Sequence, residues 1–236
     1  MEATVQQLKK QVRILKIYSL VSGALFLFIL FSAFKNPEQK FGVIRAKGLI
    51  IEDNSGKDRI LLGAPIPFSA GRVRTDTSLV RKYWAKNFGK PDQYMNWYKD
   101  YYHGAVGMVV MNDSGFDRVL IGDKLADPNT GKRMFEPAGV LWNDAHGWER
   151  GGIGANTTED GKTRSVIGVD NANGEAAHIF ALEDGTNAIA ISGDDGTLLM
   201  GFSKKDGVYF ENKESFTGMK FFNKKGELVW EQKMNK

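Results

Sequence analysis

The feature that most constrains the fold is an uncharged apolar run near the N-terminus. From Ile17 to Phe34 the chain has 18 consecutive residues without a charge. As a helix with a rise of 1.5 Å per residue, this run would be about 27 Å long, close to the thickness of the hydrocarbon core of a bilayer. A helix buried in a soluble domain normally keeps a polar stripe, and this run has none. The sequence therefore predicts a transmembrane helix over residues 17–34.

A cleaved signal peptide is the closest alternative to a retained anchor. Four Lys or Arg residues between positions 9 and 16 precede the apolar run, as they would in a signal peptide. However, the run is longer than a typical signal-peptide core, and Phe34 and Lys35 stand where a cleavage site needs small residues. We therefore expect a retained signal-anchor.

The same basic residues predict the orientation of the chain. An excess of Lys and Arg beside a membrane helix marks the cytoplasmic side. We expect residues 1–16 to form a cytoplasmic amphipathic helix, residues 35–42 a linker and residues 43–236 an extracytoplasmic domain. In a Gram-negative cell, this would be an inner-membrane protein whose domain faces the periplasm.

Self-association is predicted from the spacing of apolar residues before the membrane segment. Val5, Leu8, Val12 and Leu15 follow a 3-4-3 spacing, and the same register continues to Phe26. This spacing is typical of a helix that pairs with another helix, and it predicts a homo-oligomer through residues 5–26. An amphipathic helix lying on the membrane surface has the same spacing, so both interpretations stay open.

The clearest motif after the anchor is a repeated turn. It reads Asp or Asn, two residues, Gly, one residue, an acid, Arg, and a short segment ending in Gly, at residues 53–63, 112–122 and 144–154. Looser copies occupy residues 171–174, 193–196 and 223–226. An Asp or Asn side chain favours a turn, and Gly accepts the positive φ of a tight hairpin. We therefore predict six hairpins, with Gly56, Gly115 and Gly147 in structural turn positions and the acid and Arg facing solvent.

The repeat predicts a mainly β domain. Its turn glycines are separated by 22 to 59 residues, so a strict solenoid period is absent. We expect an irregular solenoid, or a meander or sandwich of hairpins, with a short helical insertion. This repeat resembles the D-x-x-G-x-x-R-x-x-L-G hairpins of uncharacterised membrane-anchored bacterial proteins over roughly residues 43–200. That resemblance implies no activity.

The insertion at residues 67–103 is rich in aromatic and basic residues. We predict two short helices, the first capped by Thr77 or Ser78 and stopped by Gly89, and the second starting at Pro91. The aromatic rings could cap an open end of the β core, form a protein interface, or bind a glycan or a lipid headgroup. The ligand-binding candidates are Arg81, Tyr83, Trp84, Tyr94, Trp97 and Tyr98.

Familiar catalytic chemistry is missing from the sequence. The chain has no cysteine, and no nucleophile elbow, P-loop or HExxH pair. Its three histidines lie on separate segments, and the net charge of +4 is modest. We therefore expect no catalytic residues, no metal, no cofactor and no nucleic-acid partner.

These observations predict a non-enzymatic structural or protein-interaction component of the bacterial cell envelope. The alternative is a module that binds a glycan or lipid headgroup through the insertion. An enzyme that uses pairs of Asp or Glu residues is a third hypothesis, weakened because the repeat already accounts for many carboxylates. Burial of Trp84 and Trp97 would favour the first hypothesis over the second.

Overall fold

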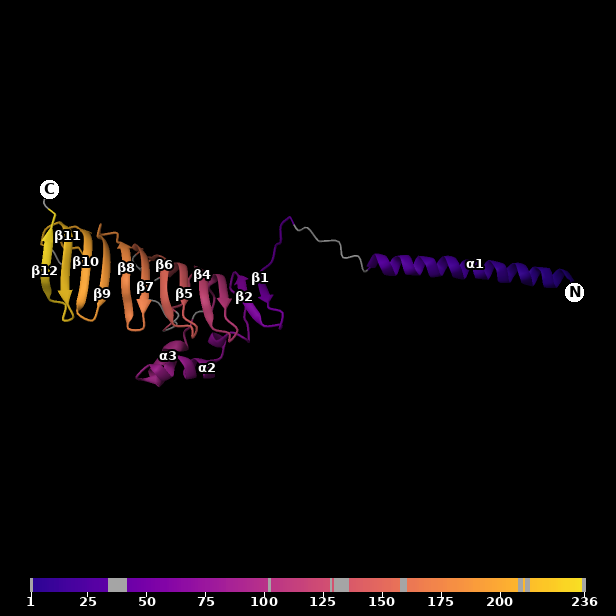
Figure 1. The fold of residues 1–236 in the computed structure, drawn as a ribbon, viewed down its shortest axis with the longest axis horizontal. Coiled ribbons are helices and arrows are strands. Elements are labelled where there is room, and N and C mark those ends of the chain that lie inside the picture. The colour runs from indigo at the N-terminus through magenta and orange to yellow at the C-terminus, as the bar shows by residue number, and fades with distance from the viewer. Residues whose placement is uncertain are drawn as a thin grey trace. The chain divides into compact units, whose positions relative to one another are not determined.

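The computed structural model describes residues 2–33, 42–101, 103–127, 129, 136–157, 161–207, 210 and 213–234. The chain divides into two compact units, Met1–Arg45 and Ala46–Lys236. The fold is an N-terminal long helix followed by a mainly β domain (Figure 1). Phe34, the last residue of the predicted membrane segment, lies outside the described residues.

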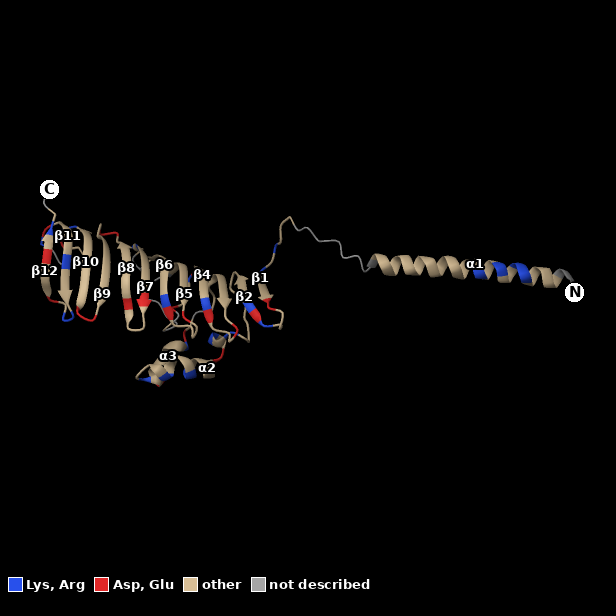
Figure 2. Cartoon of the chain, in the orientation of Figure 1, with Lys and Arg blue, Asp and Glu red and all other residues tan. Residues whose placement is uncertain are grey.

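The first unit contains one helix, α1, Glu2–Ala33. It joins the predicted cytoplasmic helix and the predicted membrane segment without a break. Within α1, residues Thr4–Ser32 are long and apolar enough to cross a membrane, although a signal sequence would have the same properties. All its basic residues lie in its N-terminal half (Figure 2). The structure thus contains an exposed apolar helix that is consistent with either a signal-anchor or a signal sequence.

The second unit is built on one antiparallel sheet of twelve strands, paired in chain order from β1 to β12. The strands are β1 (Gly48–Glu52), β2 (Asp58–Gly63), β3 (Val106–Met111), β4 (Asp117–Asp123), β5 (Glu136–Asn143), β6 (Glu149–Thr157), β7 (Thr163–Asn171), β8 (Gly174–Ala181), β9 (Asn187–Gly193), β10 (Gly196–Ser203), β11 (Phe216–Asn223) and β12 (Leu228–Lys233). The meander arrangement is therefore confirmed, with no second sheet among the described residues. The first strand begins at Gly48, five residues after the predicted start of the domain at residue 43.

The six predicted hairpins join β1–β2, β3–β4, β5–β6, β7–β8, β9–β10 and β11–β12. In the first of these turns, the Asp53 carboxylate accepts hydrogen bonds from the amides of Ser55 (2.8 Å) and Lys57 (3.2 Å). Gly56, Gly115 and Gly147 have φ values of 77°, 79° and 77°. In each of the three turns an extra residue shifts the register beside the hairpin, which is the signature of a β-bulge.

The glycine that ends each repeat has a different role. Six glycines lie opposite one another on six consecutive strands, in the order Gly48, Gly63, Gly107, Gly122, Gly139 and Gly154. A Cβ atom built on Gly139 would lie 2.7 Å from the Cα atom of Gly154. The row therefore lets neighbouring backbones approach more closely than side chains would allow.

The motif arginines cross from one hairpin to the next. Nε of Arg59 donates to the carbonyl oxygen of Met111 (3.2 Å), and Nε of Arg118 donates to that of Asn143 (3.1 Å). Each bond joins a strand that follows a turn to the strand that precedes the next turn. Arg118 is exposed, as predicted, and the side chain of Arg59 is 27% exposed, but both side chains also link consecutive hairpins.

The insertion connects β2 to β3 and packs against the turns of the β3–β4 and β5–β6 hairpins. It contains the helices α2 (Thr77–Tyr83) and α3 (Pro91–Tyr98), with the 3-10 turns η1 (Val73–Thr75) and η2 (Ala85–Asn87). α3 begins at Pro91, as predicted. The other two predicted boundaries were wrong: Asp76 caps α2 by accepting hydrogen bonds from the amides of Ser78 (2.7 Å) and Leu79 (3.3 Å), and α2 ends at Tyr83.

Three clusters of buried side chains form the core on the covered face. The first joins the insertion to the β3–β4 turn and includes Trp84 and Phe116. In the second, Leu61 and Leu120 of the sheet cluster with Ile66, Ala105 and Leu125 of the connecting segments. The third lies over β8–β11, where Phe210 packs beside Phe216. The covered face thus receives its second layer from connecting segments of the same chain.

Candidate functional site

The predicted ligand-binding residues of the insertion do not form a row of exposed rings. Trp84, Tyr94 and Tyr98 are buried, and Trp84 has no exposed surface at all. Tyr83 is half-buried against Phe116. Only Trp97, which is 36% exposed, and Arg81, whose side chain forms an ion pair with Asp92, face solvent. The rings therefore mainly cap the β core.

The buried side chain of Arg74 lies among these rings. The guanidinium of Arg74 lies 3.7 Å from the centre of the Trp84 ring, and the Tyr98 hydroxyl donates a hydrogen bond to the Arg74 carbonyl oxygen. Burial raises the pKa of Tyr98, so its hydroxyl stays protonated as a donor. Cation–π contact and hydrogen bonding thus stabilise a polar group inside an aromatic cluster.

A buried ion pair fastens the insertion to the sheet. Nε and Nη2 of Arg72 donate to the two carboxylate oxygens of Asp117 at 2.8 and 2.7 Å, and both side chains are almost fully buried. Burial by itself would lower the pKa of Arg72, but the charge and hydrogen bonds of Asp117 raise it above the ordinary value. Asp117 is the acid of the second repeat, so the prediction that this residue faces solvent was wrong.

The insertion also packs against two of the repeat turns. The amide of Val73 donates to the carbonyl oxygen of Gly115 (2.9 Å), and a Cβ atom built on Gly147 would lie 2.8 Å from Cζ2 of Trp84. In Figure 1, α2 and α3 lie beside the ends of the strands at which these hairpins turn. The turn glycines therefore serve both the hairpins and the docking of the insertion.

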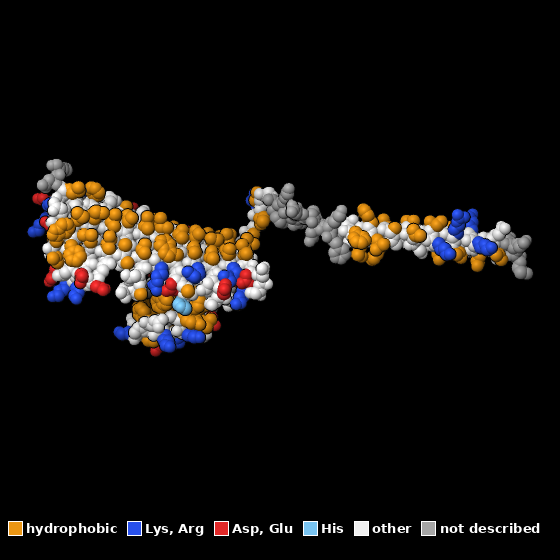
Figure 3. All heavy atoms as spheres, viewed as in Figure 1, with side chains coloured by type: hydrophobic (Ala, Val, Ile, Leu, Met, Phe, Trp, Pro, Cys, Tyr) orange, Lys and Arg blue, Asp and Glu red, His pale blue; other side chains and the backbone are white. Residues whose placement is uncertain are grey.

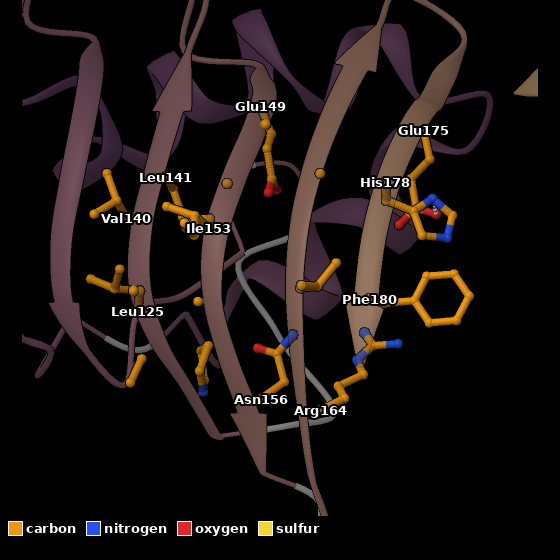
Figure 4. A pocket seen from close by; sticks show the side chains of 18 of the residues that line it. Leu125, Val140, Leu141, Glu149, Ile153, Asn156, Arg164, Glu175, His178 and Phe180 are labelled. Atoms are coloured by element: carbon orange, nitrogen blue, oxygen red, sulfur yellow. Dashed lines mark ion pairs between the residues drawn. The ribbon is translucent and has the colours of Figure 1, made fainter. Parts of the chain in front are cut away.

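A small cleft of about 110 Å³ lies on the covered face, over β5–β8 (Figure 4). It is hollow because Gly152 and Gly168, paired on β6 and β7, have no side chains to fill it. Polar groups surround it, including Glu149 and His178. Nδ1 of His178 lies 3.8 Å from a carboxylate oxygen of Glu175, which is long for an ion pair. The described residues that line the cleft include no Ser, Thr or Cys, and no three His, Asp or Glu side chains gather there closely enough to hold a metal ion.

The three histidines do not converge. His103 precedes β3, His146 lies in the β5–β6 turn and His178 lies on β8. Within the described parts of the chain, no three His, Asp or Glu side chains gather closely enough to hold a metal ion. The expectation of no metal therefore stays a prediction, since other parts of the chain are not described.

The opposite face of the sheet carries an uninterrupted band of apolar side chains. One row has an aliphatic residue on each of eleven consecutive strands, and none of the eleven is buried. The register pairs them in this order: Leu49, Leu62, Met108, Ile121, Val140, Ile153, Ile167, Ile179, Ile189, Met200 and Met219. We call this row, together with the parallel row two residues along each strand, the apolar face.

The second row of the apolar face is also free of charge. It starts at Ile51 and Ile60, passes through Val169 and Ile191, and ends at Trp230. Val169 and Ile191 are 49% and 52% exposed. Most charged residues of the sheet lie near the hairpin ends of the strands instead (Figure 2). Figure 3 shows the hydrophobic side chains continuing across the sheet.

The apolar face forms a groove over its C-terminal half. This groove has a volume of about 1300 Å³, and its walls include Ile167, Ile179 and Met200. A monomeric soluble protein rarely exposes so large an apolar surface unless that surface binds something. This face was not among the sites predicted from the sequence. The alternation of apolar residues along each strand was its only signal, and alternation does not reveal which face the connecting segments cover.

Helix α1 carries a second exposed apolar surface. Val5, Leu8, Val12 and Leu15 are all about half exposed or more. The sequence spacing that predicted a helix pair is therefore present on a continuous helix.

Comparisons with protein-family models, curated proteins and solved structures found no match to this chain.

Proposed function

We propose that this chain is a membrane-anchored, non-enzymatic assembly component of the bacterial cell envelope, whose sheet domain binds its partners outside the cytoplasm. The observation that carries this proposal is the apolar face, which spans the sheet and includes no charged residue in its two rows. Such a surface fits a protein interface, since the buried centre of an interface is depleted of charge.

Membrane anchoring is the second part of the proposal. The apolar stretch of α1 is long enough to cross a bilayer, and the four basic residues that precede it favour a cytoplasmic N-terminus. A retained anchor keeps the domain in membranes after an alkaline wash. A reporter fused after Lys236 should then be active only outside the cytoplasm.

Two results would contradict the anchored topology. Activity of the reporter inside the cytoplasm would reverse the orientation. Release of a mature species starting near residue 35 would instead support the signal-peptide alternative.

Binding of a glycan or a lipid headgroup by the insertion is the second candidate function. It now depends on Trp97 and on the exposed basic residues of the first helical segment, because Trp84, Tyr94 and Tyr98 are buried. Arg81 already pairs with Asp92, which reduces its availability to an anionic ligand. The burial of Trp84 supports the scaffold, whereas the exposure of Trp97 leaves one ring for the binding module.

One experiment separates these two functions. The full-length protein is tagged at its C-terminus, cross-linked in cells and purified from membranes together with whatever it binds. We expect Ile167→Asp with Ile191→Asp to lose these partners, because both changes place charge on the apolar face. Arg81→Ala with Trp97→Ala should keep them. The reverse pattern would favour the binding module.

A further inference from the structure

We propose that the partner of the apolar face is a second copy of this same chain, so that two sheets pack face to face through it. This inference deepens the proposed function and rests on it. Four features of the sheet support it: its layering, the area of the apolar face, the lack of charge on that face and the kind of side chains there.

The first step is that, among the described residues of the sheet domain, a second layer lies on one face of the sheet only. A sheet with an apolar face normally buries it against another layer of structure. Connecting segments cover the opposite face, where Leu61 and Leu120 are buried. On the apolar face, by contrast, Ile153 and Ile179 remain 47% and 50% exposed. The described part of the sheet domain therefore leaves the apolar face without a second layer.

The second step is the size of the face. Neighbouring strands lie about 4.8 Å apart, so twelve strands extend over about 50 Å. Two rows of side chains cover about 13 Å of each strand, which gives a footprint of about 700 Å². A specific interface of standard size buries about 600–1,000 Å² on each partner. The apolar face is therefore large enough for a stable dimer.

The third step is charge. In a two-fold symmetric dimer the same patch meets itself, so any unpaired charge near the centre would face a like charge. The rows from Leu49 to Met219 and from Ile51 to Trp230 contain no Asp, Glu, Lys or Arg. Such a face is compatible with a copy of itself, whereas a charged partner would gain no ion pair from it.

The fourth step is the kind of side chain. The first row consists of Leu, Ile, Val and Met, which project from both sheets and interdigitate when two sheets pack about 10 Å apart. α1 carries its own stripe at Val5, Leu8, Val12 and Leu15, which matches the spacing of paired helices. Two self-compatible surfaces on one chain support each other, because contact at one raises the effective concentration at the other.

The absence of cysteine makes this proposal directly testable. Two-fold symmetry allows two arrangements of fully overlapping sheets. In one, each strand faces the same strand of the partner. In the other, the strand order is reversed, so that β1 faces β12 of the partner. In both arrangements β6 and β7 face themselves or each other. Single cysteines at Ile153→Cys and Ile167→Cys therefore report on either arrangement. Glu175→Cys on β8 is the matched control, since its side chain is 75% exposed and lines the cleft on the opposite face.

Each full-length variant is treated in native membranes with a bismaleimide whose reach matches the sheet spacing of about 10 Å. We expect a covalent dimer from Ile153→Cys and Ile167→Cys and none from Glu175→Cys. The control also separates face-to-face contact from proximity caused by α1 alone, because α1 would bring all three thiols equally near. Unsubstituted copies with two different tags should co-purify.

Three results would overturn the proposal. The first is equal cross-linking from all three positions, and the second is no dimer although the face thiols react readily with a soluble maleimide. The third is protection of the face thiols without a dimer, which would show that a lipid chain or another protein covers the face. None of these results changes the membrane retention or the reporter topology. The proposed function is therefore tested separately from the dimer.

Discussion

Alanine substitution of the turn glycines tests whether the insertion is docked on the repeat. Gly56, Gly226, Gly115 and Gly147 all have φ values between 77° and 79°. Alanine in this backbone region costs about 1–2 kcal/mol at each position. A Cβ atom at Gly56 or Gly226 meets no atom within 4 Å, so backbone strain accounts for the whole expected loss of stability at these two positions.

The other two glycines carry an additional steric cost. At Gly147 the new Cβ atom lies 2.8 Å from Cζ2 of the fully buried Trp84, and at Gly115 it overlaps the carbonyl oxygen of Gly71. Overpacking of this kind costs about 1–3 kcal/mol more. We therefore expect Gly115→Ala and Gly147→Ala to lose about 2–5 kcal/mol in total.

Urea unfolding of the full-length protein in a non-ionic detergent measures these losses, with tryptophan fluorescence as the signal. Trp84 and Trp148 lie 6.4 Å apart in the cluster affected by Gly147→Ala. Adding Trp84→Phe should reduce the further loss caused by Gly147→Ala, because the smaller ring leaves room for the methyl group. Equal losses at all four glycines would refute the docking of the insertion on these turns.

Three further predictions concern polar groups. Arg72→Met or Asp117→Leu alone should each cost about 3–5 kcal/mol, because each leaves a buried charge unpaired, and the double variant should cost much less; additive losses in urea unfolding would contradict this. Hydrogen bonds from Ser55 lower the pKa of Asp53 from 3.8 to about 2. The contribution of this carboxylate to stability is therefore present above pH 3.8 and is lost as the pH falls toward 2. Asp53→Asn should flatten this part of the stability–pH profile, and an unchanged profile would argue against these hydrogen bonds in the turn. Asp76→Ala should cost about 1 kcal/mol as the loss of a helix cap, and a larger loss from Ser78→Ala would assign the cap to Ser78 instead.

Local features of the fold could be read from the sequence because each depends on neighbouring residues. The uncharged run from Ile17 predicted a helix, since only a helix satisfies its own backbone in an apolar environment. The repeated Asp or Asn followed by Gly predicted the hairpins, since one side chain and one positive φ form the turn. The start of α3 at Pro91 follows from the fixed φ of proline.

Features that depend on residues far apart in the chain needed the tertiary structure. The sequence did not predict that Arg72 pairs with Asp117, 45 residues away, or that Trp84 packs against Gly147. It also offered Thr77 and Ser78 as helix caps as readily as Asp76, since all three residue types fit that role.

The apolar face illustrates the same limit most clearly. Alternation along β3 places Met108 and Val110 on one face and Val109 and Met111 on the other, and both faces of this strand are apolar. Only the register across twelve strands aligns such residues into continuous rows, and only the path of the connecting segments decides which face they cover. The sequence by itself determined the strands and their turns, and the tertiary structure decided which face of the sheet was left exposed, because that depends on contacts between distant parts of the chain.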